Sequence, residues 1–476
     1  MEEPQLRRRS VIPDVEKVAP VLVPQHDLAE DSADSQQVRG WRGWIKSFER
    51  TMAYYNLEAR GIQRVMPDER HDLRSLGYTQ ISVLWFSINL AANNITLGML
   101  GPAVYYLSFT DASLLAVFGA LVGCLPVAYI ATFGPRSGNR SMVFARCRWT
   151  DPLCRLPNGS LSVIVGIVIV AVLTWGVTTF GYSILHYYER YAWAPQIVVL
   201  CILAGVAGPH FDLTTPSSGD NELTIIGDRL SFFSLCLSAA ITYAGGAADF
   251  FVYYPESTAR WKVFTVTMVG LLLSFTFAFV LGIGLGSGIA TVPAWNSAYE
   301  VSQGALIVAG YAPWAPLDPS AASSVDFQVL GRFFMAVPRV VWNTVGVIIY
   351  TVCAIAGRQN LAEIFTNFLA LMGYWVSIWI AISLEEHLVF RKWSGLGWNW
   401  DAWNSKEKLP VGAAALIAFL IGWAGAILCM AQVWYIGPIA AEVGDYGGDM
   451  GNYVGFAWAA LVYPPLRWLE IKRFGR

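Results

Sequence analysis

Long apolar stretches constrain this chain more than any other feature of its sequence. About ten stretches of roughly 18 to 25 residues carry few or no charges, and each is long enough to cross a hydrocarbon core of about 30 Å. Lipid offers the backbone no hydrogen-bond partners, so such stretches must be helices. The sequence therefore predicts an all-α, polytopic membrane protein. The stretches lie at 80–107, 112–133, 161–182, 191–208, 230–253, 263–288, 339–356, 361–383, 410–436 and 449–467.

The charge and cysteine content argues against several other classes of protein. Only 14% of the 476 residues are charged, whereas a soluble domain carries about 25%. The net charge of −2 gives no basic footprint for a nucleic acid. The seven Cys form no CxxC pair and the five His form no HExxH motif, so we expect neither a metal site nor a disulfide framework. No catalytic constellation stands out, and we expect neither an enzyme nor a cofactor.

The two ends differ from the apolar body in composition. Residues 1–40 are acidic and poor in aromatics, which predicts a disordered cytoplasmic tail. Residues 41–79 are basic and aromatic, as in a juxtamembrane segment on the cytoplasmic face. We expect the transmembrane domain to occupy 80–467, with a short basic cytoplasmic C-terminus at 468–476.

The distribution of Arg and Lys predicts an orientation, because cytoplasmic loops carry an excess of both residues. The Arg- and Lys-rich connections, which we expect to be cytoplasmic, are 135–155, 255–262, 332–339, 391–408 and the C-terminus. The connections that lack both residues, which we expect to be external, are 209–228, 289–330 and 437–448. Both termini are then cytoplasmic.

At two places the predicted sides of successive connections disagree with the number of spans between them. The connections 135–155 and 186–190 both carry basic residues, yet a single span lies between them. The loop 289–330 is expected outside and 332–339 inside, with no convincing span between them. Each conflict disappears if one helix is missing there, so the charges suggest a twelve-helix ancestor that lost two. The alternative is that short loops and re-entrant pieces break a statistical rule.

The first span holds an unusual number of polar side chains for a helix in lipid. Buried amides are costly unless paired, so we expect them to face a bundle interior or a cavity. Gly98 and Gly101-Pro102 permit a helix break, and a broken helix offers backbone groups to a ligand. We therefore predict a substrate site here, with helix–helix contacts as the alternative. The polar residues are Ser87, Asn89, Asn93, Asn94 and Thr96.

The span at 230–253 holds a second interruption. Gly245-Gly246 can break the helix and contribute to binding, and Asp249 is the clearest acid within an apolar span. A carboxylate in a membrane is a candidate for proton or cation coupling, which we predict for Asp249. Capping of a broken helix and an ion pair with a basic residue are the structural alternatives. Two Gly-interrupted spans in corresponding parts of a chain indicate a transporter site between inverted repeats.

A charged cluster closes the span at 361–383. Glu385-Glu386-His387 stands beside Arg391 and Lys392. A metal site is conceivable, but an interfacial ion-pair cluster is the prediction. The Trp residues that follow are expected at the cytoplasmic interface. They are Trp393, Trp398, Trp400 and Trp403.

A series of motifs, found in order over roughly residues 50–476, resembles one family. The motifs are Trp85–Asn89, Leu100–Pro102, Thr132–Arg136, Tyr188–Pro195, Ala247–Pro255, Ala354–Arg358, Asn367–Trp375, Glu385–His387, Leu409–Gly412 and Val462–Arg467. Together they resemble the fungal purine–cytosine permease branch of the nucleobase–cation symporter-1 family.

The resemblance implies twelve helices in a leucine-transporter-like inverted-repeat fold, against about ten predicted spans here. It implies proton-coupled uptake of cytosine, adenine, guanine or hypoxanthine at the plasma membrane. In this family the substrate lies between helices one, three, six and eight. The resemblance places the polar stretch Ser87–Thr96 at that site, together with Tyr243, which stands where relatives often stack a Trp on the base. It also implies gating residues at Asn367 and Tyr374.

Two family helices lack a counterpart in this sequence. At 145–157 the chain passes almost directly into the segment that resembles helix four. At 328–338 it passes directly to the connection before helix nine. These are the two places at which the predicted sides of the connections disagree with the number of spans. The alternative function is therefore a non-transporting, truncated or mis-spliced permease-like membrane protein.

Overall fold

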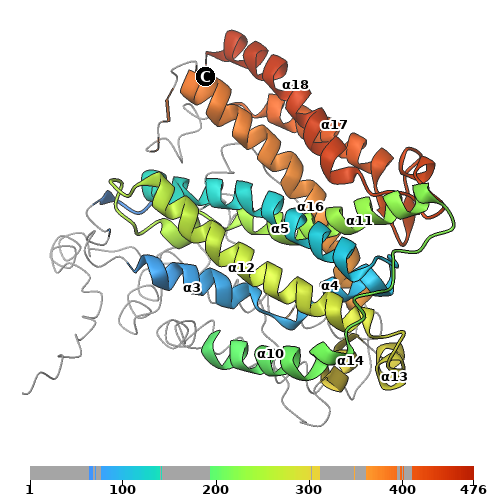
Figure 1. Ribbon diagram of the computed structural model, residues 1–476. Helices are drawn as coiled ribbons and strands as arrows, with labels where there is room; N and C mark the ends of the chain where they lie inside the picture. The colour runs from blue at the N-terminus through green and yellow to red at the C-terminus, as the bar shows by residue number, and fades with distance from the viewer. Residues whose placement is uncertain are drawn as a thin grey trace, which may run out of the picture. The chain divides into compact units, whose positions relative to one another are not determined.

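The computed structural model describes residues of one compact unit within 56–476 (Figure 1). The described residues are 64–67, 70, 77–139, 141, 193–301, 303–310, 348, 361–393, 397–398, 400 and 410–475. Several predicted features lie outside them: the tail at 1–40, most of the juxtamembrane segment 41–79, the span at 161–182 and nearly all of the span at 339–356, and the joins at 145–157 and 328–338.

Four of the described helical stretches are long and apolar enough to cross a membrane, and α3 with α4 adds a fifth if counted as one bent span. Each of the four is a main helix, in three cases with a short helix at its end. They are α5 (Phe109–Ala131) with α6 (Phe133–Ser137), α11 (Glu222–Ile241) with η4 (Thr242–Gly245), α12 (Arg260–Ser287), and α16 (Leu361–Glu385) with the π-helix η8 (Glu386–Trp393).

One face of α5 presents large apolar side chains to the outside of the protein. These side chains recur at the three- and four-residue spacing of a single helix face. They are Leu114, Phe118, Val122 and Leu125, all exposed. The opposite face is buried and carries small residues, among them Ala112, Ala116, Ala120 and Cys124. In water such an apolar stripe would favour aggregation, whereas lipid solvates it.

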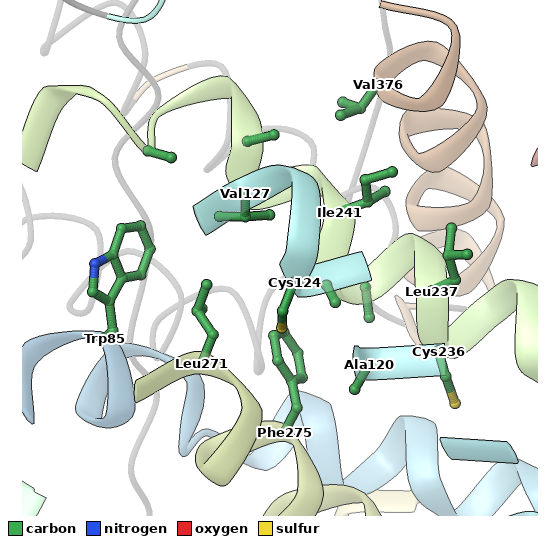
Figure 2. Packing of buried hydrophobic residues seen from close by; sticks show 14 of the residues in the cluster. Trp85, Ala120, Cys124, Val127, Cys236, Leu237, Ile241, Leu271, Phe275 and Val376 are labelled. Atoms are coloured by element: carbon green, nitrogen blue, oxygen red, sulfur yellow. The ribbon is translucent and has the colours of Figure 1, made fainter. Parts of the chain in front are cut away.

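The core forms where α5, α11 and α12 meet the broken first span. α3 (Tyr78–Asn89) and α4 (Ala92–Ala103) both pack on α12, and α5 packs on α11 and α12. Figure 2 shows side chains from these helices converging, with Cys124 of α5 close to Phe275 of α12. Within a bilayer this close packing, rather than the exclusion of water, holds the helices together.

Glycines allow α4 and α12 to approach each other backbone to backbone. A Cβ on Gly286 would lie 2.7 Å from the Met99 carbonyl oxygen, and a Cβ on Gly282 would collide with the Ile95 carbonyl oxygen. Gly98 packs against α12 in the same way from the other side. The two α12 glycines are four residues apart, as in the small-residue interfaces of membrane helices.

A second cluster forms between the C-terminal helices. Here α17 and α18 pack on each other, and α18 also packs on α16. The elements are α17 (Ala413–Cys429), strands β1 (Ala431–Gln432) and β2 (Tyr435–Ile436), η10 (Ala440–Glu442) and α18 (Gly451–Phe474). The two strands form an antiparallel hairpin, so the predicted span at 410–436 extends too far at both ends.

A third cluster joins α10 and the first span to short helices in a predicted loop. The elements are α10 (Trp193–Ala207), η3 (Gly208–His210), α13 (Pro293–Val301) and α14 (Gln303–Gly310). The short helix η5 (Asp249–Phe251) belongs to the first core instead, where it packs on α5 and α6. Leu203 of α10 and Leu306 of α14 pack with Leu90 and Ile95 of the first span. The predicted external loop 289–330 therefore contains two helices in its first part.

Two helices extend well beyond one of their predicted ends. α11 begins at Glu222 rather than at 230, because Asn221 caps it: the Asn221 side-chain oxygen accepts a hydrogen bond from the Thr224 N–H at 2.8 Å. α18 continues to Phe474, so most of the predicted C-terminus at 468–476 forms its last turns.

Candidate functional site

A bend of 56° divides the first span into α3 and α4. Between the two helices the backbone at Leu90 and Ala91 leaves the helical conformation. The Asn89 carbonyl accepts a hydrogen bond from the Asn94 side chain at 2.6 Å, and the Leu90 carbonyl accepts one from the Gln196 side chain on α10. Side-chain amides therefore satisfy backbone carbonyls that the break releases.

The position of this break differs from the prediction. Gly98 lies inside α4, and Pro102 lies in the last turn of the same helix. The prediction that Gly98 or Gly101-Pro102 breaks the span is therefore wrong. The chain bends instead where Asn89 and Asn94 supply local partners for the backbone.

Two buried polar atoms next to the break have no hydrogen-bond partner among the described residues. They are the indole nitrogen of Trp85 and the side-chain oxygen of Asn89, and both residues are 0% exposed. The Asn89 side-chain nitrogen donates to the Trp85 carbonyl at 2.9 Å, which fixes the amide and leaves its oxygen unpaired. An unsatisfied buried polar group costs about 1–3 kcal/mol. A ligand that offers an acceptor and a donor here would remove both penalties.

Aromatic rings surround Trp85. Its ring centroid lies 6.2 Å from that of Tyr243, edge to face at 81°, and 4.5 Å from that of Phe250. The Tyr243 ring also contacts Phe275 at 5.9 Å, and Figure 2 shows Phe275 and Leu271 on the same side of the core as Trp85. Because Tyr243 is only half-buried, part of its ring remains open to a planar ligand.

The second interrupted span leaves the α-helical conformation near the same aromatic residues. α11 gives way to the 3₁₀-helix η4 at Thr242, and the Gly246 N–H donates to the Tyr243 carbonyl at 3.2 Å. A Cβ on Gly245 or on Gly246 would meet no atom of the described residues within 4 Å, so the backbone borders open space within the described part of the chain. The structure confirms that this span is interrupted at its glycine pair.

The predicted polar residues of the first span separate into two groups. Asn89 and Asn94 are buried at the break, and Ser87 is half-buried on α3. Asn93 is exposed, and the Thr96 hydroxyl donates to the Asn93 carbonyl at 2.7 Å within α4. The structure therefore gathers two of the three amides at the break and places Asn93 and Thr96 outside these contacts.

Asp249 lies half-buried at the start of η5. Its carboxylate accepts a hydrogen bond from the Ser141 N–H, and the Ser141 hydroxyl accepts one from the Ala248 N–H at 2.9 Å. This reciprocal pair joins the end of the second interrupted span to the chain beyond α6. This contact reaches the chain beyond α6 and not a backbone N–H of η5, so it does not bear out the capping alternative, and the coupling role stays a prediction.

Tyr374, a predicted gating residue, is buried in a polar contact between helices. Its hydroxyl donates to Asp449 at 2.7 Å and accepts a hydrogen bond from the Gln432 side chain at 2.6 Å. Asp449 is also buried and has no cationic partner among the described residues; it accepts a further bond from the Gly451 N–H at 2.9 Å. The side chain of Asn367, the other predicted gating residue, lies outside the described part of α16.

Sequence reasoning missed Trp85 and Asp449 as members of the polar interior. The spacing of Trp85 and Asn89 could have shown that both lie on one helix face, because residues four apart share a face. No local signal identifies Asp449. It follows the glycine-rich connection 437–448, which was expected to be external, and only the fold shows the chain returning between α11 and α16.

The structure confirms the ion-pair cluster at the end of α16. Glu386 lies 2.8 Å from Arg391 and 3.0 Å from Arg467 of α18, and it accepts a hydrogen bond from the Tyr463 hydroxyl at 2.8 Å. Breaking a buried ion pair costs about 3–5 kcal/mol. This cluster therefore fastens α16 to α18.

Comparisons with known proteins relate this arrangement to membrane transporters. A family model described as "Permease for cytosine/purines, uracil, thiamine, allantoin" matches residues 71–150. The chain is 32% identical to a purine-cytosine permease of Emericella nidulans, over 97% of this chain and 99% of that protein. It is 29% identical to a vitamin B6 transporter of Saccharomyces cerevisiae, over 88% of each protein.

Among solved structures, the chain is similar to Mhp1, a nucleobase-cation-symport-1 family transporter in a closed conformation with bromovinylhydantoin bound. The match has a TM-score of 0.54 and covers 88% of this chain and 96% of that chain, at 13% sequence identity. At this identity the likeness concerns the fold alone. It confirms the predicted all-α fold of the leucine-transporter type.

Proposed function

Because the chain belongs to the permease family for cytosine and purines, we propose that it takes up purine bases and cytosine together with protons across the plasma membrane. The observation that carries this proposal is the pair of buried, unpartnered polar atoms at the first break, the Trp85 nitrogen and the Asn89 oxygen. The Trp85 ring lies beside that of Tyr243, which is half-buried.

A nucleobase matches these groups chemically. The edge of cytosine, adenine, guanine or hypoxanthine carries N–H donors for the Asn89 oxygen and acceptors for the Trp85 N–H. Its planar face suits stacking on Tyr243. The open backbone at Gly245 and Gly246 leaves room for such a ring. A site whose buried polar groups stay unpaired without the right ligand discriminates strongly against analogues that lack the matching groups.

For the coupling of proton and base, we propose Asp249 as the proton carrier. Its position at the end of the second interrupted span supports this role. A protonated carboxyl group accepts hydrogen bonds more weakly than a carboxylate does. Protonation would therefore loosen the contact with the Ser141 N–H and release η5 from the chain beyond α6.

For the gate, we propose that α16 controls access to the base through Asn367 and Tyr374. α16 packs against η4, which carries Tyr243. A shift of α16 along this contact would open or close the space beside the Tyr243 ring. The hydrogen bond from Tyr374 to Asp449 would hold one of these positions.

For the orientation, we propose that both termini are cytoplasmic. Three connections rich in Arg and Lys support this assignment, since their residues Arg136, Arg260 and Trp400 line one pocket and so lie on one side of the protein. Epitope tags at the two ends should become accessible to antibody only after permeabilisation of the cell. A tag that stains on intact cells would contradict the assignment.

Expression in a cell without its own nucleobase permeases tests the transport proposal. We expect uptake of labelled cytosine or adenine that unlabelled base competes and that a protonophore abolishes. Vitamin B6 belongs among the competitors because one relative is a vitamin B6 transporter. Absence of uptake, with the protein present at the cell surface, would overturn transport by this chain and favour the non-transporting alternative.

The length of the alignment supports weighing that alternative. The alignment with the Emericella nidulans permease extends over 512 positions, whereas this chain has 476 residues, so at least 36 positions have no residue here. Insertion of the relative's corresponding segments at 145–157 and 328–338 separates the two cases. Uptake that requires the insertions would identify a truncated permease, and equal uptake without them would show that the chain is complete for transport.

A further inference from the structure

A pocket of about 390 Å³ lies away from the residues of the proposed base site and shares none of them. We call it the basic pocket. Its charged lining residues are Arg136 of α6, Glu256 before α12, and Arg260, the first residue of α12. Three connections that the charge pattern predicts to be cytoplasmic supply its walls. It therefore faces the same side of the membrane as the predicted termini.

The charges in the basic pocket do not balance. Among the described residues, neither Arg136 nor Arg260 has an ion-pair partner, and the Arg136 Nε is buried without a hydrogen-bond partner. Glu256 is already engaged by two other guanidinium groups, from Arg64 at 3.6 Å and from Arg70 at 3.4 Å. The pocket lining thus holds two guanidinium groups and one carboxylate, and that carboxylate already pairs with two further guanidinium groups, which leaves a local excess of positive charge.

A rigid aromatic wall closes the other side of the basic pocket. The rings of Trp398 and Trp400 stack at 4.8 Å with 5° between their planes, and the His387 ring stacks on Trp398 at 6.1 Å. The Trp398 N–H donates to the His387 Nδ1 at 2.9 Å, and Phe133 meets His387 edge to face at 4.9 Å. These contacts fix the wall before any ligand arrives.

We propose that the basic pocket binds the phosphate group of a phosphate ester from the cytoplasmic side. Arg136 and Arg260 supply planar forks of N–H donors, which match the oxygens of a phosphate in two-point contacts. The pocket exceeds the size of one phosphate group, so it also has room for the part of the ligand attached to it.

Two sources of a phosphate ester reach this position. One is the headgroup of an anionic lipid, since the pocket belongs to connections at the membrane surface and Trp residues settle at that level. The other is a soluble phosphate ester in the cytoplasm, whose organic part would lie against the ring wall. Both sources share the chemistry of the contact with Arg136 and Arg260.

Binding to the purified full chain, reconstituted in lipid nanodiscs, tests the proposal and its source. One arm compares the melting temperature in phosphatidylcholine alone with that in phosphatidylcholine containing phosphatidic acid. The second arm titrates adenosine monophosphate, inorganic phosphate and acetate into phosphatidylcholine nanodiscs and follows Trp fluorescence. We expect a higher melting temperature with phosphatidic acid, or saturable quenching by a phosphate compound, and neither effect with acetate.

Variants locate the response in the pocket. Arg136→Gln and Arg260→Gln should each weaken the response by roughly ten-fold or more, because each removes a charge-assisted contact. Arg136→Lys should retain part of it, as the charge remains and the two-point fork is lost. Lys472→Gln is the matched control: Lys472 lies on α18 over the Trp468 ring, outside the pocket, and its loss should leave binding unchanged.

Each outcome either supports or overturns the phosphate site. A response to phosphatidic acid alone identifies the lipid source, and a response to soluble phosphate compounds identifies the cytoplasmic source; each supports the site. No response in either arm, an equal response to acetate, or a response unaffected by both glutamine variants overturns it. Melting temperatures of the variants without probe show that they are folded. Because no readout involves uptake, failure here is distinct from failure of the transport proposal.

Discussion

At the scale of single residues, the unpaired atoms of Trp85 and Asn89 carry the most specific prediction. Asn89→Ala and Trp85→Phe should each raise the KM for the base by roughly 10- to 100-fold, because each removes one hydrogen bond in a buried site. Trp85→Phe should lower the melting temperature little, since it deletes an N–H that is unsatisfied in the empty protein, whereas Asn89→Ala also removes the hydrogen bond to the Trp85 carbonyl and should lower it more. Uptake kinetics and thermal melting of purified protein check both statements.

Trp379→Phe is the matched control for this pair. The Trp379 N–H is also buried without a hydrogen-bond partner among the described residues, but it lies on α16. Its loss should leave the KM unchanged. An equal effect of Trp379→Phe and Trp85→Phe would mean that the Trp85 N–H has no particular role in binding.

Tyr374 provides a prediction that separates gating from binding. Tyr374→Phe keeps the ring and removes the hydrogen bond to Asp449 at 2.7 Å. It should lower stability by about 1–2 kcal/mol, since the Asp449 carboxylate loses a donor. If this bond holds one position of α16, the maximal uptake rate should change while the KM stays the same. A changed KM with an unchanged rate would count against the gate.

At the scale of elements, some glycines let two helix backbones pack closely, whereas others border open space. Gly286→Ala should prevent normal folding, because the new methyl group would lie 2.7 Å from the Met99 carbonyl oxygen. Gly246→Ala should fold normally yet reduce uptake, because its methyl group would enter the open space beside Tyr243. Amount of folded protein at the surface and uptake per molecule distinguish the two effects.

Gly205→Ala completes this comparison. Gly205 lies within α10, outside the proposed site, and a Cβ there would meet no atom of the described chain within 4 Å, as at Gly246. The substitution should affect neither folding nor uptake. If Gly205→Ala and Gly246→Ala reduced uptake alike, the space at Gly246 would have no connection with the base.

The same elements show how far the sequence predicts the structure. The interruption at Gly245-Gly246 was predicted correctly, although neither glycine adopts a positive φ. The break in the first span was placed at Gly98, whose role is to admit the backbone of α12. A glycine that permits bending and one that permits close packing look the same in a sequence. Only the partner helix distinguishes them, and that contact is not encoded locally.

At the scale of the whole molecule, proton coupling must show in the response of uptake to external pH. If the proposed coupling holds, uptake by an active chain should rise as the external pH falls, because the proton would be a co-substrate. Asp249→Asn should flatten this dependence and prevent accumulation of base above the external concentration, since the amide cannot exchange a proton. Uptake that remains concentrative and pH-dependent in Asp249→Asn would remove Asp249 from coupling.

The ion-pair cluster at Glu386 has a mechanical consequence. The Glu386 carboxylate forms ion pairs with Arg391 of η8, which follows α16, and with Arg467 of α18, and α18 packs on α17. A gate built on α16 therefore cannot move independently of the helices to which it is bound. Any displacement of α16 large enough to admit a base would also displace α17 and α18. The C-terminal third of the described chain would therefore move as one rigid body.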